Sequence, residues 1–149
     1  MNKTDQILVL CTEIAHEISC DFVGLAIYNP QGKELRWMYA VGNRNDKYRR
    51  IVVRYGKGIA GQVIRSGRPM TISQFPQNII GKATDYPIML AEQLISALAQ
   101  PIHRGGIPWG VLLIGNRLES AFTKEQQDKI KKAVNSIENM IKDPMFTLG

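Results

Sequence analysis

A glycine-rich turn near the middle of the chain joins a strand-like segment to a helix-like one. In RYGKGIAGQVIRSGRP, which starts at Arg54, four glycines lie in and around the expected helix. Apolar Ile51–Val53 precede the turn, and Ile59–Ser66 can form a helix that Gly67 ends. Glycines at such a turn let the backbone come close to another group. The stretch therefore predicts a strand, a tight turn and a helix beside a point of close contact.

The composition fits one globular domain. The chain has 149 residues, of which 44% are hydrophobic, enough for a real core over residues 1–149. No apolar run approaches the ~18 residues of a membrane span. The N-terminal MNKTDQILVL lacks the order of a signal peptide, because Asp5 and Gln6 interrupt it. We therefore expect a cytoplasmic protein without membrane contact.

The chain has few of the residues that usually bind metals or act as nucleophiles and bases. Cys11 and Cys20 lie on what reads as one helix, and His16 and His103 are expected at the surface. None of the four has the spacing of a metal site. No nucleophile with a base and no carboxylate pair can be placed beside the glycine turn. The sequence therefore predicts no metal, no cofactor and no enzyme activity.

The net charge of +6 raises the question of nucleic-acid binding. The cations cluster in two places, the stretch from NRNDKYRR through Lys57 and the C-terminal helix. Neither stacking aromatics nor a recognised binding motif accompanies them, so a solvated face is the expectation. The run Arg49, Arg50 and Arg54 fits a solvated strand edge and also an acidic partner, and positive charge raises the local concentration of small anions.

The remaining pattern predicts an α+β fold: an antiparallel sheet with the terminal helices on one face and a loop-and-helix pocket on the other. The expected elements are a helix of about fifteen residues capped by Thr4 or Asp5, a hairpin around Asn29–Gly32, the strand Ile51–Val53, the helix Ile59–Ser66, the strand Met70–Ser73, a short helix Pro87–Gln93, a hairpin around Arg104–Gly106, and a helix opened by the capping box of Thr123 and Gln126. The loop Gln74–Asp85 is long for a compact domain, as in lids and binding loops.

These segments resemble a known family. GKGIAGQVIRSGRPMTI is similar to the central signature of GAF domains, a glycine-rich turn into a helix and then Gly-x-Pro into the next strand. The spacing to LISALAQPIHRGGIPWGVLLIGN and AFTKEQQDKIKKA also matches, so the resemblance covers essentially the whole chain. It implies a central antiparallel sheet of about six strands, flanked by helices, with a small-ligand pocket. GAF domains bind many ligands, so the fold does not name this one.

Three short features narrow the resemblance within the family. Trp37 in the second strand, GIAG at the turn and YPI at Tyr86–Ile88 resemble the bacterial nitrate receptors that work beside an oxygen-sensing histidine kinase. The resemblance implies a cytoplasmic nitrate receptor in a two-component system that controls nitrate and nitrite respiration. It also implies that the nitrate-free form holds the kinase back and that nitrate relieves this.

The expected site is built from backbone donors at two helix starts. The predicted nitrate-binding residues are Trp37, Gly58, Ile59, Ala60, Tyr86, Pro87 and Ile88. The first amides of a helix lack intrahelical partners and carry the positive end of its dipole. Gly58 turns the chain so that two such amides point outward, and Pro87 leaves the Ile88 amide free. Trp37 adds an indole N–H, and Tyr86 closes the pocket with its ring or hydroxyl. The same residues also fit plain core packing.

The lining selects the kind of anion. A mostly apolar seat disfavours a strongly hydrated dianion such as sulfate, whereas planar, weakly hydrated nitrate loses less solvation. Four heavy atoms at a ceiling of about −1.5 kcal/mol each give roughly −6 kcal/mol, or a dissociation constant of tens of micromolar.

Other readings of the sequence stay open. A GAF sensor for a cyclic nucleotide or another small organic ligand would need a larger cavity with polar side chains. A free methionine sulfoxide reductase of this family works with cysteines around its pocket, whereas Cys11 and Cys20 belong to the first helix. Asp85 is expected to help cap the Pro87 helix. The apolar stripes of the terminal helices fit packing within the domain, and they also fit a homodimer.

Overall fold

The computed structural model describes residues 2–147. The strands are β1 (Phe22–Asn29), β2 (Glu34–Val41), β3 (Val52–Arg54), β4 (Met70–Ile72), β5 (Ser96–Arg104) and β6 (Ile107–Asn116). The α-helices are α1 (Lys3–Ile18), α2 (Gly58–Ser66), α3 (Pro87–Ala91) and α4 (Lys124–Ile141), and the 3-10 helices are η1 (Lys47–Arg50) and η2 (Ala83–Asp85). All strand pairs are antiparallel, in the order β3-β2-β1-β6-β5-β4. The predicted α+β fold is confirmed.

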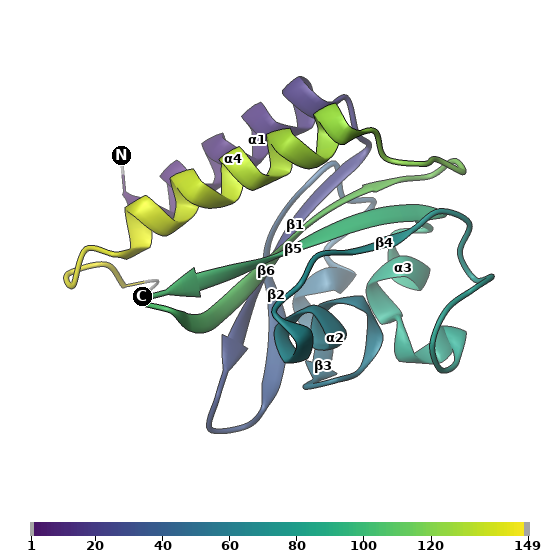
Figure 1. Ribbon diagram of the computed structural model, residues 1–149, viewed down its shortest axis with the longest axis horizontal. Coiled ribbons are helices and arrows are strands. Elements are labelled where there is room, and N and C mark those ends of the chain that lie inside the picture. The colour runs from purple at the N-terminus through teal and green to yellow at the C-terminus, as the bar shows by residue number, and fades with distance from the viewer. Residues whose placement is uncertain (1, 148–149) are drawn as a thin grey trace.

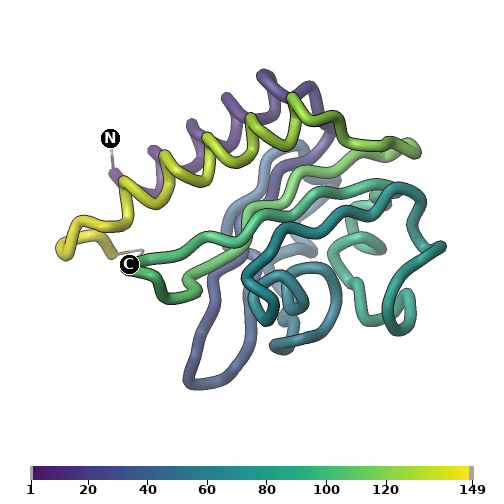
Figure 2. The backbone as a smooth tube through the Cα atoms, viewed as in Figure 1, coloured from purple at the N-terminus to yellow at the C-terminus, as the bar shows by residue number. Residues whose placement is uncertain are grey.

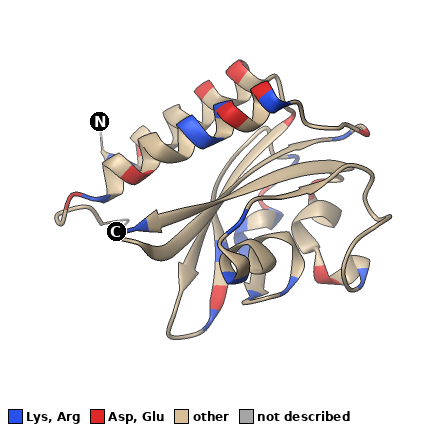
Figure 3. Cartoon of the chain, viewed as in Figure 1, with Lys and Arg blue, Asp and Glu red and all other residues tan. Residues whose placement is uncertain are grey.

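The terminal helices α1 and α4 lie side by side across one face of the sheet (Figure 1). Both present apolar residues to the strands at helical spacing. These residues are Ile7, Cys11, Ile14 and Ile18 of α1 and Ile130, Val134, Ile137 and Ile141 of α4. Residues of both charge signs occur along these helices (Figure 3), and Glu13, Glu17, Lys131 and Lys132 among them are exposed. The two terminal helices therefore form a layer that packs against one face of the sheet.

The ends of these two helices follow local capping chemistry. At α4, the Gln126 amide donates to Thr123 Oγ1 at 3.1 Å, and the Thr123 amide donates to Gln126 Oε1 at 2.9 Å, which confirms the capping box. At α1, the cap is Asn2 and not Thr4 or Asp5, because Asn2 Oδ1 accepts from the Asp5 amide at 2.8 Å.

The opposite face of the sheet carries α2, α3 and the long loop that precedes α3 (Figure 1). Helix α2 packs on β3, β5 and β6. Figure 2 shows the chain leaving β4, running along the edge of the molecule and returning through η2 to α3. A second hydrophobic cluster fills the space between these segments and the sheet. The sheet thus separates two cores, one beneath the terminal helices and one beneath α2 and α3.

A bulge in β2 decides which aromatic side chain faces which core. Leu25 pairs with Tyr39 and Ala26 pairs with Trp37, so Met38 is an extra residue between them. One extra residue shifts the alternation of side chains between the faces of a strand. As a result Trp37 belongs to the core beneath α2, whereas Tyr39 belongs to the core beneath α1 and α4.

None of the helices within residues 2–147 combines the length and the apolar character needed to cross a bilayer. Nor does this part of the chain bring together three or more histidine, cysteine, aspartate or glutamate side chains in a metal-binding arrangement.

Candidate anion-binding site

The structure places the seven predicted binding residues on the α2 face of the sheet. Trp37 lies on β2, Gly58, Ile59 and Ala60 form the first turn of α2, Tyr86 directly precedes α3, and Pro87 and Ile88 begin α3. Five of them, Trp37, Ile59, Ala60, Tyr86 and Ile88, belong to one buried cluster. The geometry therefore gathers groups that are far apart in the sequence, and their role in binding stays a prediction.

The start of α2 offers backbone donors without a side-chain cap. Lys57 occupies the N-cap position and makes no side-chain capping bond. The amides of Gly58, Ile59 and Ala60 stand in the first turn, where an α-helix supplies no acceptor. These donors and the positive end of the helix dipole can bind an anion without a cationic side chain.

The start of α3 has a similar arrangement over a single turn. Tyr86 is the N-cap and makes no side-chain capping bond, and its carbonyl accepts from the amides of Met89 and Leu90 at 3.1 and 3.3 Å. Pro87 has no N–H, so the Ile88 amide is the donor of this turn that lacks an intrahelical acceptor. The prediction that Asp85 caps this helix was wrong. Its carboxylate accepts from the Lys82 amide at 3.0 Å and thereby caps η2.

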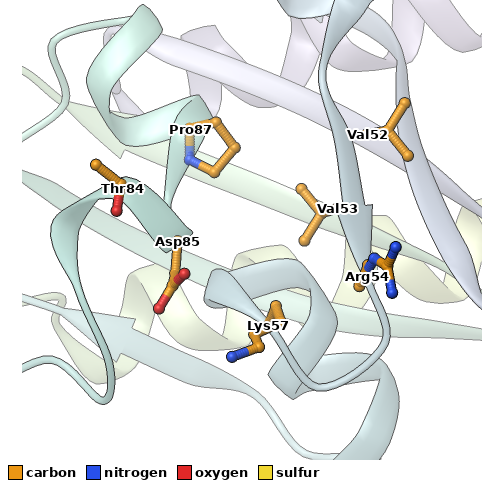
Figure 4. A pocket seen from close by; sticks show the side chains of 7 residues that line it. All are labelled: Val52, Val53, Arg54, Lys57, Thr84, Asp85 and Pro87. Atoms are coloured by element: carbon orange, nitrogen blue, oxygen red, sulfur yellow. The ribbon is translucent and has the colours of Figure 1, made fainter.

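A surface pocket lies on the solvent side of the two helix starts. It has a volume of about 170 Å³ and is lined by Val52, Val53, Arg54, Lys57, Thr84, Asp85 and Pro87 (Figure 4). Arg54 and Lys57 bring two positive charges to this pocket, and Asp85 brings one negative charge. Of the seven predicted binding residues, Pro87 alone lines this pocket, and the other six are buried behind it. The cations can raise the concentration of small anions at the surface beside the helix starts.

The indole N–H of Trp37 is an unpaired donor inside the core. The side chain is 1% exposed, and Nε1 has no hydrogen-bond partner within residues 2–147. Gly24 on the neighbouring strand leaves room for the ring, because a Cβ there would lie 3.1 Å from it. A buried indole N–H generally has an acceptor, so this one calls for an explanation. An anion bound beside it would supply the acceptor.

The Tyr86 hydroxyl is engaged within the protein. It donates to the Ile80 carbonyl at 2.6 Å and accepts from Gln62 Nε2 at 2.8 Å. The Tyr86 ring packs in the buried cluster, with its centroid 5.8 Å from that of Phe75. The hydroxyl proton is therefore already used, and of the two ways in which Tyr86 was expected to close the pocket, packing by its ring is the one that remains.

Gln62 is the polar residue that the sequence prediction missed. Its side chain is buried in α2, and Nε2 donates to the Gly58 carbonyl as well as to Tyr86. A signal was present in GIAGQVI, where Gln62 is the one polar side chain in an apolar run and lies one helical turn after Gly58. A buried polar side chain within an apolar helix needs partners, and such partners often mark a site.

The cysteine and histidine side chains lie away from this cluster. Cys11 packs beneath α1 and α4, and Cys20 lies just beyond α1, which ends at Ile18, so the two do not share one helix as expected. Burial raises the pKa of Cys11 to about 12 and that of Cys20 to about 11, which keeps both thiols protonated and weakly nucleophilic. His16 is exposed on α1, and the His103 amide donates to Glu138 of α4 at 2.7 Å.

An antiparallel six-stranded sheet with helices on both of its faces is the architecture of a known domain family. The chain belongs to the GAF domain family, whose pattern it matches over residues 3–142. No curated protein sequence matches the chain.

Among solved structures, the chain is similar to NreA of Staphylococcus aureus mutated in its nitrate-binding site. One such structure has 31% identity and a TM-score of 0.74, over 82% of this chain and 91% of that one. Another has 30% identity and a TM-score of 0.75, over 86% and 98%. The free methionine-R-sulfoxide reductase of Neisseria meningitidis shares the fold, with a TM-score of 0.75 over 91% of this chain and 75% of that one, at 15% identity.

Proposed function

We propose that this protein is a nitrate receptor that modulates an oxygen-sensing histidine kinase of a two-component system controlling nitrate and nitrite respiration. The observation that carries the proposal is the unpaired indole N–H of Trp37, buried in the same cluster as the first turns of α2 and α3. The similarity to NreA, a protein with a nitrate-binding site, supports the same ligand. The kinase partner comes from the resemblance to nitrate receptors of this family.

Nitrate suits the donors that the cluster offers. The indole N–H of Trp37 and the first amides of α2 and α3 are uncharged donors, and a planar monoanion has three oxygens to accept from them. The surroundings of Ile59, Ala60 and Ile88 are apolar, so an ion with a tightly held hydration shell would lose more than these donors return. Selectivity for nitrate over sulfate follows from this difference in solvation.

Signalling requires that nitrate bind one conformation better than another. The loop Gln74–Asp85 and the short helix α3 are the moving part in this proposal. A bound anion accepts a hydrogen bond from the Ile88 amide, and the Tyr86 ring packs over it. Without it, two positive helix ends face each other and the segment loosens. Closure changes an outer surface that the kinase reads, and the nitrate-free form holds the kinase back.

Thermal shift and isothermal titration test the ligand. Nitrate at millimolar concentration raises the melting temperature, because it binds only the folded state, whereas sulfate and cyclic nucleotides have no effect. The titration gives a dissociation constant of tens of micromolar. A response to a cyclic nucleotide but not to nitrate would instead support the alternative sensor. Co-purification with the cognate kinase tests the partner, and binding to the kinase that ignores nitrate would contradict the proposed signalling.

A further inference from the structure

A chain of hydrogen bonds runs from the first turn of α2 to an exposed loop. Gln62 Nε2 donates to the Gly58 carbonyl at 2.6 Å and to the Tyr86 hydroxyl at 2.8 Å. The Tyr86 hydroxyl in turn donates to the Ile80 carbonyl at 2.6 Å. Gly58 and Tyr86 both belong to the proposed anion site, whereas the Ile80 side chain is 70% exposed. One buried amide group thus contacts both helix starts and, through Tyr86, the loop.

The bond from Gln62 is the one direct hydrogen bond between α2 and the segment 74–91 in the part of the chain that the structure describes. The segment is fastened differently at its other end. Glu92, which directly follows α3, is fully buried, and its Oε1 accepts from Arg117 Nη2 and from the Arg44 amide, each at 2.8 Å. Arg117 Nε also donates to the Glu92 carbonyl at 2.9 Å. The segment is therefore tied firmly at Glu92 and, at its other end, by the bonds from Gln74 to Glu119 and from the Phe75 amide to the Ile95 carbonyl, whereas its link to α2 is the single neutral bond at Tyr86.

We propose that Gln62 is a positioning residue that latches the 74–86 segment to α2 and transmits the state of the anion site to the loop at Ile80. The inference rests on the proposed function, since the anion it invokes is nitrate. A ligand that draws the starts of α2 and α3 together holds the Tyr86 hydroxyl against Gln62 Nε2, whose other bond, to the Gly58 carbonyl, stays within α2. The Tyr86 hydroxyl is then held in line with the Ile80 carbonyl, and the loop around Ile80 becomes ordered.

Hydrogen exchange of the 77–86 amides tests the latch directly. Gln62→Met removes both donated protons at a similar side-chain volume, and Gln74→Met is the matched control, because the exposed Gln74 side chain bonds only Glu119 within the described residues. Without nitrate, we expect these amides to exchange about fivefold faster in Gln62→Met than in the wild type, and unchanged in the control. With saturating nitrate, exchange slows in the wild type and in the control but hardly at all in Gln62→Met.

Titration of the same variants separates this inference from the proposed function. Gln62→Met still binds nitrate, with a dissociation constant raised by no more than about tenfold, since the backbone donors remain. Unchanged exchange in ligand-free Gln62→Met would overturn the latch, and nitrate protection equal to that of the wild type would overturn the transmission. If the wild type binds no nitrate, the proposed function and the transmission fail together, while the ligand-free comparison still decides the latch. Gln62→Leu replaces Gln62→Met if the latter does not fold.

Discussion

The carbonyl oxygen of Asp85 lies 2.5 Å from the position that a Cβ on Gly58 would occupy. Gly58 also has a φ of +62°, in the left-handed region that side chains disfavour. The backbone at the start of α2 therefore touches the backbone just before α3. Only glycine permits this contact, and the contact sets the spacing of the two helix starts.

Gly58→Ala is expected to destabilise the fold and remove the nitrate response. The Cβ strains the backbone and pushes Asp85 away, at a total cost of about 2–3 kcal/mol. Gly105→Ala is the control, because Gly105 has a φ of +59° but nothing within 4 Å of its Cβ position, so only the conformational cost of about 1 kcal/mol remains. Urea denaturation with and without nitrate measures both quantities. Equal losses in the two variants would show that the contact with Asp85 does not matter.

Trp37→Phe is expected to weaken nitrate binding by about tenfold while keeping the fold. The change removes the unpaired indole N–H but retains an aromatic ring, and a hydrogen bond to a charged acceptor contributes about 1.5 kcal/mol or more. Trp109→Phe is the control, since Trp109 packs in the other core, beside Phe146. Isothermal titration compares the two. An unchanged nitrate affinity in Trp37→Phe would remove the main support for the proposed function.

Ala60→Leu is expected to abolish nitrate binding. Ala60 is buried in the first turn of α2, so the added carbons fill space beside the amides and cost about 1–3 kcal/mol by overpacking. Ala133→Leu makes the same addition on α4, beneath the opposite face, and should keep the nitrate-dependent rise in melting temperature. Thermal shift measures both variants, and a nitrate response that survives in Ala60→Leu would place the ligand elsewhere.

Arg117→Met is expected to destabilise the fold by about 3 kcal/mol, because it leaves the buried Glu92 carboxylate without its counter-charge. Lys129→Met breaks an exposed pair with Glu125, worth less than about 1 kcal/mol, and one exposed bond from Nζ to the Glu17 carbonyl. Adding Glu92→Gln to Arg117→Met removes the uncompensated charge and should recover part of the loss. Denaturant titration of the three variants checks the order, and a double variant less stable than Arg117→Met would contradict this account.

The two thiols make stability fall at alkaline pH. Burial raises the pKa of Cys11 from 9.0 to about 12 and that of Cys20 to about 11. Above pH 9 the unfolded chain releases thiol protons that the folded chain retains, so the stabilising contribution present below pH 9 is lost as the pH rises. The free energy of unfolding should therefore decrease less steeply from pH 9 to about 11 in Cys11→Ala than in the wild type. Identical slopes would show that Cys11 is not held protonated by the fold.

The sequence predicted the fold well because its turns and caps are local. Hairpins at Asn29–Gly32 and Arg104–Gly106 and the Thr123 capping box depend on a few neighbouring residues, and the structure confirms all three. Errors occurred where two local signals compete. Asn2 lies close to Thr4 and Asp5, all of them capable caps, and the Asn2 side chain takes the role.

The site was harder to predict, since it depends on contacts between distant residues. The glycine turn and Pro87 carry local signals of helix starts, and the structure brings these starts together. The face on which Trp37 lies depends on the bulge at Met38, which only the pairing with β1 defines. Gln62 acquires its importance from Tyr86, a residue 24 positions later. Helical periodicity cannot reveal such a partner.

The sheet acts as a partition between two cores, and this has a consequence for how such a domain can diverge. Substitutions beneath α2 and α3 can alter the cluster that holds the proposed site while the strands stay anchored by the terminal helices on the far side. Under the proposed function, ligand preference can then change in small steps, each tolerated because the other half of the interior still supports the fold.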